Sequence, residues 1–137
     1  MSPICEKVKI MIVDDEPVVR QAFTRILSGE QCTVESAANG RDALRSLQRQ
    51  RCDLVLLDLR MPGIDGLTVL REIKRNWPEV EVVVITGHAA LETAKESVAL
   101  GAFDYLAKPV GPDEVIRITN SALLHKAWAL RVDRQAA

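Results

Sequence analysis

Acidic side chains follow two separate apolar runs of this chain. Asp14 and Asp15 come directly after one run, and Asp58 ends another. Thr86 and Lys108 stand at the ends of two further apolar segments. Clustered carboxylates cannot all remain ionised without a positive counter-charge, and Mg²⁺ or Mn²⁺ prefers oxygen ligands of this kind. If these five side chains meet, they form a cation site beside a hydroxyl and an ammonium.

The apolar runs are predicted to be the strands of a parallel sheet, since Val and Ile are frequent in them. They cover residues 7–13, 32–37, 53–58, 80–86 and 103–108. Segments with apolar residues at helical spacing follow the runs, the fourth from Ala90 to Leu100 and the last from Asp113 to Arg131. Strict alternation predicts an α/β fold in which helices cover both faces of a doubly wound five-stranded sheet.

Ligands of such open sheets bind beyond the carboxyl ends of the strands, which is where the polar residues stand. A cation, a lysine and a hydroxyl together stabilise a phosphoryl group during transfer. One carboxylate must then act as the nucleophile. Asp58 is the best candidate because it stands alone after a central strand, whereas Asp14 and Asp15 form a pair suited to holding a metal. Zinc is not indicated, because no Cys/His pair has a suitable spacing.

Three segments carry a resemblance to a known family. They are "VDDEP", "LVLLDLRMPGIDGL" and "VVVITGHAALETAKESVALGAFDYLAKP", in this order. Over about residues 7–127 the chain resembles the receiver domain of two-component response regulators, most closely those of NtrC-type AAA+ transcription activators. The resemblance implies a flavodoxin-like sheet with strand order 2-1-3-4-5. We expect a receiver domain over residues 1–127, and over 128–137 an extension of the last helix or the start of a linker.

The resemblance also implies a role for each residue of the acidic site. Asp58 would be the phosphoacceptor. Asp15, Asp58 and the backbone carbonyl of Arg60 would bind Mg²⁺, or Mn²⁺ in its place, and Asp14 would hold the metal through water. Lys108 would contact the phosphoryl oxygens.

Further residues around the site have implied roles in switching and access. Thr86 would hydrogen-bond the phosphoryl group and move with it, and Tyr105 would be the aromatic side chain whose rotamer follows Thr86. Gly87 would leave room for the phosphodonor. The Lys108–Pro109 peptide bond would be cis, an isomer that is rare among X-Pro bonds in general.

Other polar residues near these motifs admit two interpretations. Arg60 and His88, each two residues after a site residue, either tune the lifetime of the phosphoryl group at the rim or are solvated side chains. Asp65 is predicted to cap the third helix rather than take part in chemistry. Glu16 is predicted to lie at the start of the first helix, where an acidic residue is favoured.

The predicted function is a phosphorylation switch that catalyses its own phosphoryl transfer and dephosphorylation but is not an enzyme in the usual sense. A sensor histidine kinase would be its partner, and the face of the fourth helix, fifth strand and fifth helix would repack to control an output, in transcription regulation. A homodimer could form through that face or through the last helix, in which Ile116, Leu123, Ala127 and Leu130 approximate a seam.

Several alternatives remain open at this point. The chain could be a stand-alone receiver that acts as a phosphorelay intermediate, a protein-interaction module or an unphosphorylated scaffold, or it could be a fragment of a longer protein. An aspartyl phosphohydrolase would need a DxD pattern after the first strand, where this chain has "DDEP". A nucleotide-binding protein would need GxGxxG or GxxxxGK there, and neither occurs.

Composition limits the remaining function classes. The 137 residues suffice for one domain, and a net charge of −1 does not favour direct binding to nucleic acid or to a membrane surface. Cys5, Cys32 and Cys52 are odd in number and are interpreted as free thiols. No signal peptide or membrane-spanning run is recognised, so a cytoplasmic location is expected.

Overall fold

The predicted sheet of five parallel strands is present, with the predicted order. The computed structural model describes residues 8–87 and 91–136, and the side chains within 8–87 and 92–127. Its elements are β1 (Val8–Val13), α1 (Pro17–Leu27), β2 (Cys32–Ala37), α2 (Gly40–Arg49), β3 (Leu54–Asp58), α3 (Gly66–Asn76), β4 (Glu81–Thr86), α4 (Leu91–Ala99), β5 (Asp104–Ala107) and α5 (Pro112–Ala136). All strand pairs are parallel, in the order β2-β1-β3-β4-β5.

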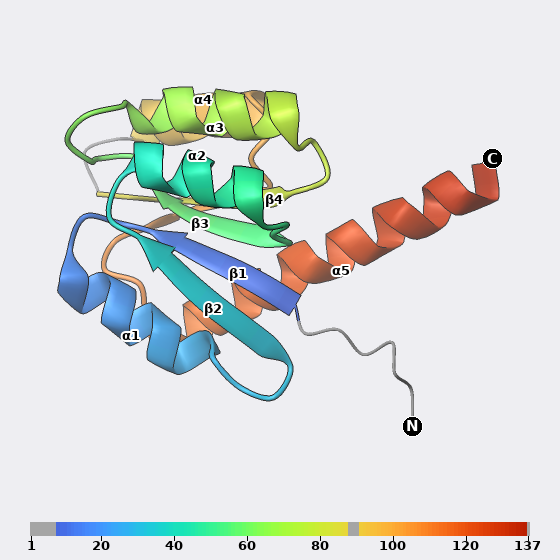
Figure 1. Cartoon of the computed structure of the whole chain (residues 1–137), viewed down its shortest axis with the longest axis horizontal. Coiled ribbons are helices and arrows are strands. Elements are labelled where there is room, and N and C mark those ends of the chain that lie inside the picture. Colours follow the sequence, from blue (N-terminus) through green and yellow to red (C-terminus); the bar gives the residue numbers. More distant parts are fainter. Residues whose placement is uncertain (1–7, 88–90, 137) are drawn as a thin grey trace.

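Helices cover the sheet on both faces, and each face has its own core (Figure 1). Successive residues of a strand point to opposite faces. In β1, Ile10 and Ile12 therefore pack with α1 and α5, whereas Met11 and Val13 pack with α2 and α3. Every residue of β3 and β4 is buried, which is typical of central strands in a parallel sheet. These two strands give the site a rigid floor.

The helix ends differ in part from the sequence-based expectation. Asp65 occupies the N-cap position of α3, but the prediction that it caps the helix is wrong, since no side-chain capping bond forms within the described residues. Asn39 caps α2, since its side chain accepts a hydrogen bond from the Asp42 backbone N–H. Gly101 follows α4 with a φ of +112°, a left-handed conformation that suits glycine.

The last helix, α5, runs from Pro112 to Ala136, past Arg131, so the helix extends through most of the 128–137 segment (Figure 1). Two contacts fasten it to the sheet. His125 Nδ1 lies 2.6 Å from Glu81 Oε2 at the start of β4, and Lys126 Nζ lies 3.0 Å from Asp53 Oδ1, one residue before β3. The helix is thus tied to the beginnings of the two strands whose other ends reach the site.

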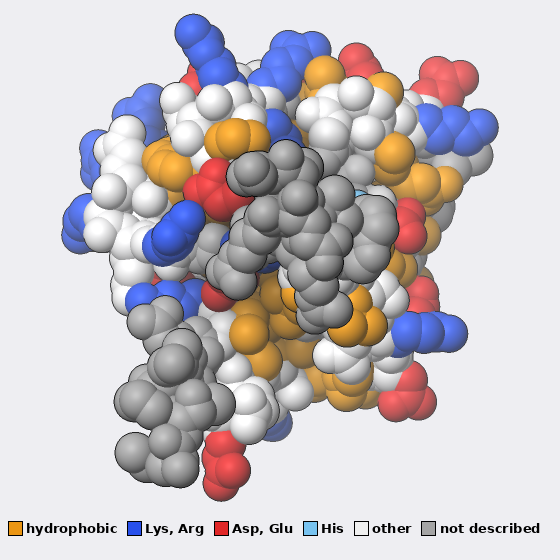
Figure 2. Space-filling view, turned by 90° about the vertical axis from the view of Figure 1, so that its right-hand side faces the viewer, with side chains coloured by type: hydrophobic (Ala, Val, Ile, Leu, Met, Phe, Trp, Pro, Cys, Tyr) orange, Lys and Arg blue, Asp and Glu red, His pale blue; other side chains and the backbone are white. Residues whose placement is uncertain are grey.

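The face toward which α5 projects carries hydrophobic side chains in its lower centre, with charged side chains of both signs around the rim (Figure 2). Leu124 of α5 is 71% exposed.

No helix among the described residues combines the length and the apolar character needed to cross a membrane.

Gly66 is predicted to be essential for stability, because α3 begins directly against the backbone that follows β3. A Cβ at Gly66 would lie 2.6 Å from the Leu59 Cα and 2.8 Å from its carbonyl oxygen. Gly66→Ala should therefore destabilise the protein by roughly 1–3 kcal/mol, the usual cost of overpacking. Urea unfolding measures the difference. Gly29→Ala is the control, since no described atom would lie within 4 Å of a Cβ added at Gly29. Equal losses in both variants would contradict this account.

Candidate functional site

The parallel sheet brings Asp14, Asp58, Thr86 and Lys108 to its carboxyl edge, as the sequence predicted. The Lys108 Nζ lies 3.1 Å from Asp14 Oδ2 and 3.3 Å from Asp58 Oδ2. Asp14 and Asp58 are only 2% and 3% exposed, while Lys108 is half-buried. The ammonium therefore bridges two buried carboxylates from different strands.

The two buried carboxylates are held in the same way. One oxygen of each accepts a hydrogen bond from the backbone N–H two residues later: Glu16 donates to Asp14 Oδ1 at 2.9 Å, and Arg60 donates to Asp58 Oδ1 at 2.9 Å. The other oxygen of each pairs with Lys108. Both side chains are thereby fixed before any ligand binds.

Asp15 and Glu16 extend the acidic group into solvent. One carboxylate oxygen each from Asp14, Asp15 and Glu16 lies within 4.8 Å of the others, close enough for a common cation. Glu16 begins α1 as expected, at its N-cap position, and its Oε1 also lies 3.4 Å from the Lys108 Nζ. Sequence reasoning underrated this residue, although its place directly after two aspartates was a visible signal. Asp58 is outside this group and instead pairs with Lys108.

The charges of the site are only partly balanced. Burial raises the pKa of Asp58, and the charge of Asp14 adds to this effect, against the opposing influence of the Arg60 backbone N–H and of Lys108. Burial by itself would lower the pKa of Lys108, but its hydrogen bond to Asp14 and the charges of Asp58 and Asp14 outweigh burial and raise that pKa. The ammonium thus stays charged, whereas the acids lack sufficient positive charge.

The residues predicted as the switch form no hydrogen bond with each other in the described structure. The Thr86 hydroxyl is buried at the end of β4 and donates a hydrogen bond to the Gly87 carbonyl at 3.3 Å. The backbone carbonyl of Thr86 accepts a hydrogen bond from the Lys108 backbone N–H. Tyr105 pairs with Val84 across β4 and β5 and packs half-buried against the core on the α3 side. Among the described residues, no hydrogen bond joins the Tyr105 hydroxyl to Thr86.

The rim residues are placed in part. Gly87 has open space around it, since no described atom would lie within 4 Å of an added Cβ. Arg60 is exposed, and His88 lies outside the described residues. The Lys108–Pro109 peptide bond is cis.

An apolar pocket that sequence reasoning missed adjoins the site. It has a volume of about 550 Å³ and is lined by Glu16, Val18, Val19, Ala22, Phe23, Gly87, Lys108, Pro109 and Val110. Val18 is 76% exposed, so this wall of the site presents apolar surface to solvent. The run Pro17-Val18-Val19 was the available signal, but its exposure depends on how α1 packs.

The burial of Asp58 predicts a pH-dependent change in stability. Its raised pKa means that the protonated form favours folding. This contribution is complete below the unfolded pKa, about 3.9, and is lost as the pH rises through the folded pKa. Asp58→Asn should therefore raise the urea midpoint of the metal-free protein at pH 7, and the gain should shrink toward pH 4. A lower midpoint at pH 7, or a gain independent of pH, would contradict this.

Comparison with known proteins agrees with this geometry. Residues 10–120 match the family model of the response regulator receiver domain. The DNA-binding transcriptional regulator NtrC of Escherichia coli strain K12 is 37% identical over 116 residues, which cover 85% of this chain and 25% of NtrC. The chain thus spans about a quarter of the length of this relative.

Solved structures show the same likeness. NtrX from Brucella abortus, crystallised in complex with ADP, superimposes with a TM-score of 0.88 at 35% identity over 93% of this chain and 30% of NtrX. A response regulator receiver domain protein from Clostridium thermocellum superimposes with a TM-score of 0.83 at 32% identity over 89% of this chain and 98% of its own. The chain belongs to the response regulator receiver domain family.

Proposed function

We propose that this chain is a phosphorylation switch in which Asp58 accepts a phosphoryl group from the phosphohistidine of a sensor histidine kinase. The observation that carries the proposal is the pairing of one half-buried ammonium, that of Lys108, with two buried carboxylates beside an exposed acidic group. Membership of the receiver family implies the kinase as partner. This function uses every member of the site.

The site fits Mg²⁺ because its donors are carboxylate oxygens with excess negative charge. Asp15, Asp58 and the Arg60 carbonyl would hold the ion directly, and Asp14 through water. Asp14, Asp15 and Glu16 already gather their oxygens, and solvent reaches Asp15. When bound, Mg²⁺ supplies positive charge that stabilises the transferring phosphoryl group. Mn²⁺ has similar ligand preferences and could replace it.

The chain's own residues divide the transfer step between them. An Asp58 carboxylate oxygen attacks phosphorus, and the phosphorus–nitrogen bond of the donor breaks. The bonding electron pair remains on the imidazole nitrogen, which is released as neutral histidine after protonation. Lys108 turns from Asp58 to the phosphoryl oxygens, and the Thr86 hydroxyl leaves the Gly87 carbonyl to donate to the same group. In dephosphorylation a water oxygen would attack phosphorus, the bond from phosphorus to the Asp58 oxygen would break, and inorganic phosphate would leave, with the same contacts from Lys108 and Thr86.

The apolar pocket supports a protein as the phosphodonor. Its lining continues from Lys108 and Gly87 to Val18 and Ala22 of α1, so a helix that presents histidine could bury apolar side chains while reaching Asp58. Exposed apolar surface at the edge of a polar site is typical of a docking surface.

The output is proposed from the same resemblance. The movement of Thr86 and Tyr105 would repack the face of α4, β5 and α5, on which Val98 and Ile116 are partly exposed. A receiver over residues 1–127, with 128–137 continuing α5, would pass this change to an output in transcription regulation or to a second copy. A stand-alone receiver in a phosphorelay would use the same face for another partner.

Phosphorylation at Asp58 can be tested with a small-molecule donor. With acetyl phosphate and Mg²⁺, the wild type should acquire an acid-labile mass increase of one phosphoryl group, measured by intact-protein mass spectrometry. Asp58→Asn should abolish it, because an amide is not the required nucleophile. Asp65→Asn is the matched control, since Asp65 follows Asp58 in the same loop region but forms no capping bond in the described structure. Persistent labelling of Asp58→Asn would refute the assignment.

The switch can be followed at the only tyrosine of the chain. Fluorotyrosine incorporation gives one ¹⁹F resonance, from Tyr105. Beryllofluoride with Mg²⁺ mimics the phosphoryl group and should shift that resonance in the wild type. In Thr86→Ala the shift should be lost although the mimic still binds, because the moving hydroxyl is absent. An equal shift in both proteins would show that Tyr105 does not follow Thr86.

A further inference from the structure

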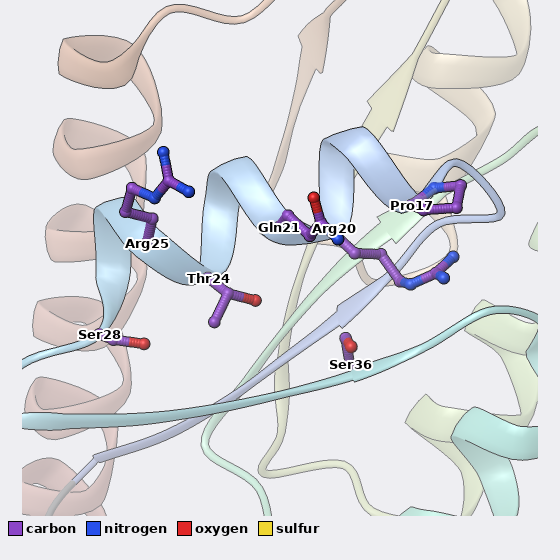
Figure 3. A pocket seen from close by; sticks show the side chains of 7 residues that line it. All are labelled: Pro17, Arg20, Gln21, Thr24, Arg25, Ser28 and Ser36. Carbon is purple, nitrogen blue, oxygen red and sulfur yellow. The ribbon is translucent and has the colours of Figure 1, made fainter.

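Arg20 contacts the acidic site although neither its type nor its spacing indicated a role. It lies on α1, and its Nη1 donates a hydrogen bond of 2.7 Å to the backbone carbonyl of Asp14. The side chain runs along one wall of a polar pocket toward the turn that joins β1 to α1 (Figure 3). That pocket is lined by Pro17, Arg20, Gln21, Thr24, Arg25, Ser28 and Ser36.

The Asp14 carbonyl needs this partner because the strand ladder stops beside it. The pairing of β1 with β2 continues one residue past β1, where the Asp14 N–H donates to the Ala37 carbonyl at 3.1 Å. The strand β2 ends at Ala37, so it offers no further N–H at this position. Backbone carbonyls in buried positions are almost always paired. The guanidinium therefore completes the end of the ladder.

Arg20 also completes the fixation of Asp14. The Asp14 N–H, its two carboxylate oxygens and its carbonyl are paired with Ala37, Glu16, Lys108 and Arg20 respectively. The carbonyl held by Arg20 belongs to the peptide unit that joins Asp14 to Asp15. Its orientation sets the direction in which Asp15 leaves the end of β1. A hydrogen bond from a charged donor is stronger than a neutral one.

We propose that Arg20 is a positioning residue for the cation site, which fixes the Asp14–Asp15 peptide so that both carboxylates face the bound ion. This inference rests on the proposed Mg²⁺ site. Arg20 touches neither the phosphoryl group nor the ion and acts only through Asp14. Residues that orient metal ligands in this way contribute strongly to metal affinity.

Charge and geometry predict opposite results when Arg20 is replaced. Loss of a cation near an acidic group should strengthen the binding of Mg²⁺, whereas loss of the hydrogen bond should weaken it. We expect the loss of geometry to dominate, because Asp15 and Glu16 are exposed and water screens their interaction with a neighbouring charge. The sign of the change therefore separates a positioning role from a general electrostatic one.

The experiment is calorimetric titration of the whole chain with Mg²⁺. Arg20→Met should weaken binding by about tenfold, the usual size of such outer-sphere effects, and Arg20→Lys should recover part of the loss because it retains a charged donor. Arg25→Met is the matched control. Arg25 lines the same pocket but has no hydrogen bond among the described residues, so its loss should leave affinity unchanged or slightly tighter.

A kinetic measurement adds a second readout. With acetyl phosphate, Arg20→Met should raise the Mg²⁺ concentration that gives the half-maximal rate of labelling, while the rate at saturating Mg²⁺ stays near that of the wild type. Thermal melts of each variant without metal confirm folding at the assay temperature. If Arg20→Met does not fold, Arg20→Lys decides the question by its intermediate affinity.

The outcomes distinguish this inference from the function on which it rests. If the wild type neither binds Mg²⁺ nor is labelled at Asp58, the proposed function itself is wrong. If the wild type does both, unchanged or tighter binding by Arg20→Met overturns the role of Arg20 alone. Equal weakening by Arg20→Met and Arg25→Met, or a lower rate at saturating Mg²⁺ with unchanged affinity, would also overturn it.

Discussion

Two carboxylates buried beside a single ammonium are the interaction on which the rest of this molecule depends. Ionised acids in such a position are costly unless positive charge compensates them. Lys108 supplies one unit of that charge and reaches both Asp14 and Asp58. Burial, together with the charge of Asp14, still leaves the pKa of Asp58 raised. The site is thus built to gain from a further cation, which connects its electrostatics with the metal dependence proposed for its chemistry.

The sheet stabilises this arrangement because its packed strands hold the charged side chains in place. Every residue of β3 and β4 is buried, and both faces of these strands are packed, which holds Asp58 and Thr86 at their ends in position. The same strands begin next to Asp53 and at Glu81, where α5 is fastened through Lys126 and His125. A change at the site can therefore alter the position of α5 at the other end of the sheet if the packing between them has two alternative states.

The chain matches only part of the length of its longer relatives. It corresponds to about a quarter of NtrC from Escherichia coli and to 30% of the crystallised NtrX chain from Brucella abortus. The long helix α5 begins two residues after Val110, which lines the apolar pocket beside Lys108. Its C-terminal end projects past the opposite end of the sheet, so this one helix spans the distance between the two ends (Figure 1).

The strands, their alternation with helices and the polar residues of the site could be predicted from the sequence, because Val- and Ile-rich runs and polar strand ends are local patterns. How those polar groups pair depends on the folded chain. Lys108 meets Asp14 across 94 residues and Asp58 across 50, and it also meets Glu16, which the sequence assigned to a helix start alone. The absence of a capping hydrogen bond from Asp65 and the presence of the hydrogen bond from Arg20 to the Asp14 carbonyl have the same physical reason. A side-chain hydrogen bond depends on where the backbone of a packed helix comes to rest, and that position is set by contacts distant in the chain.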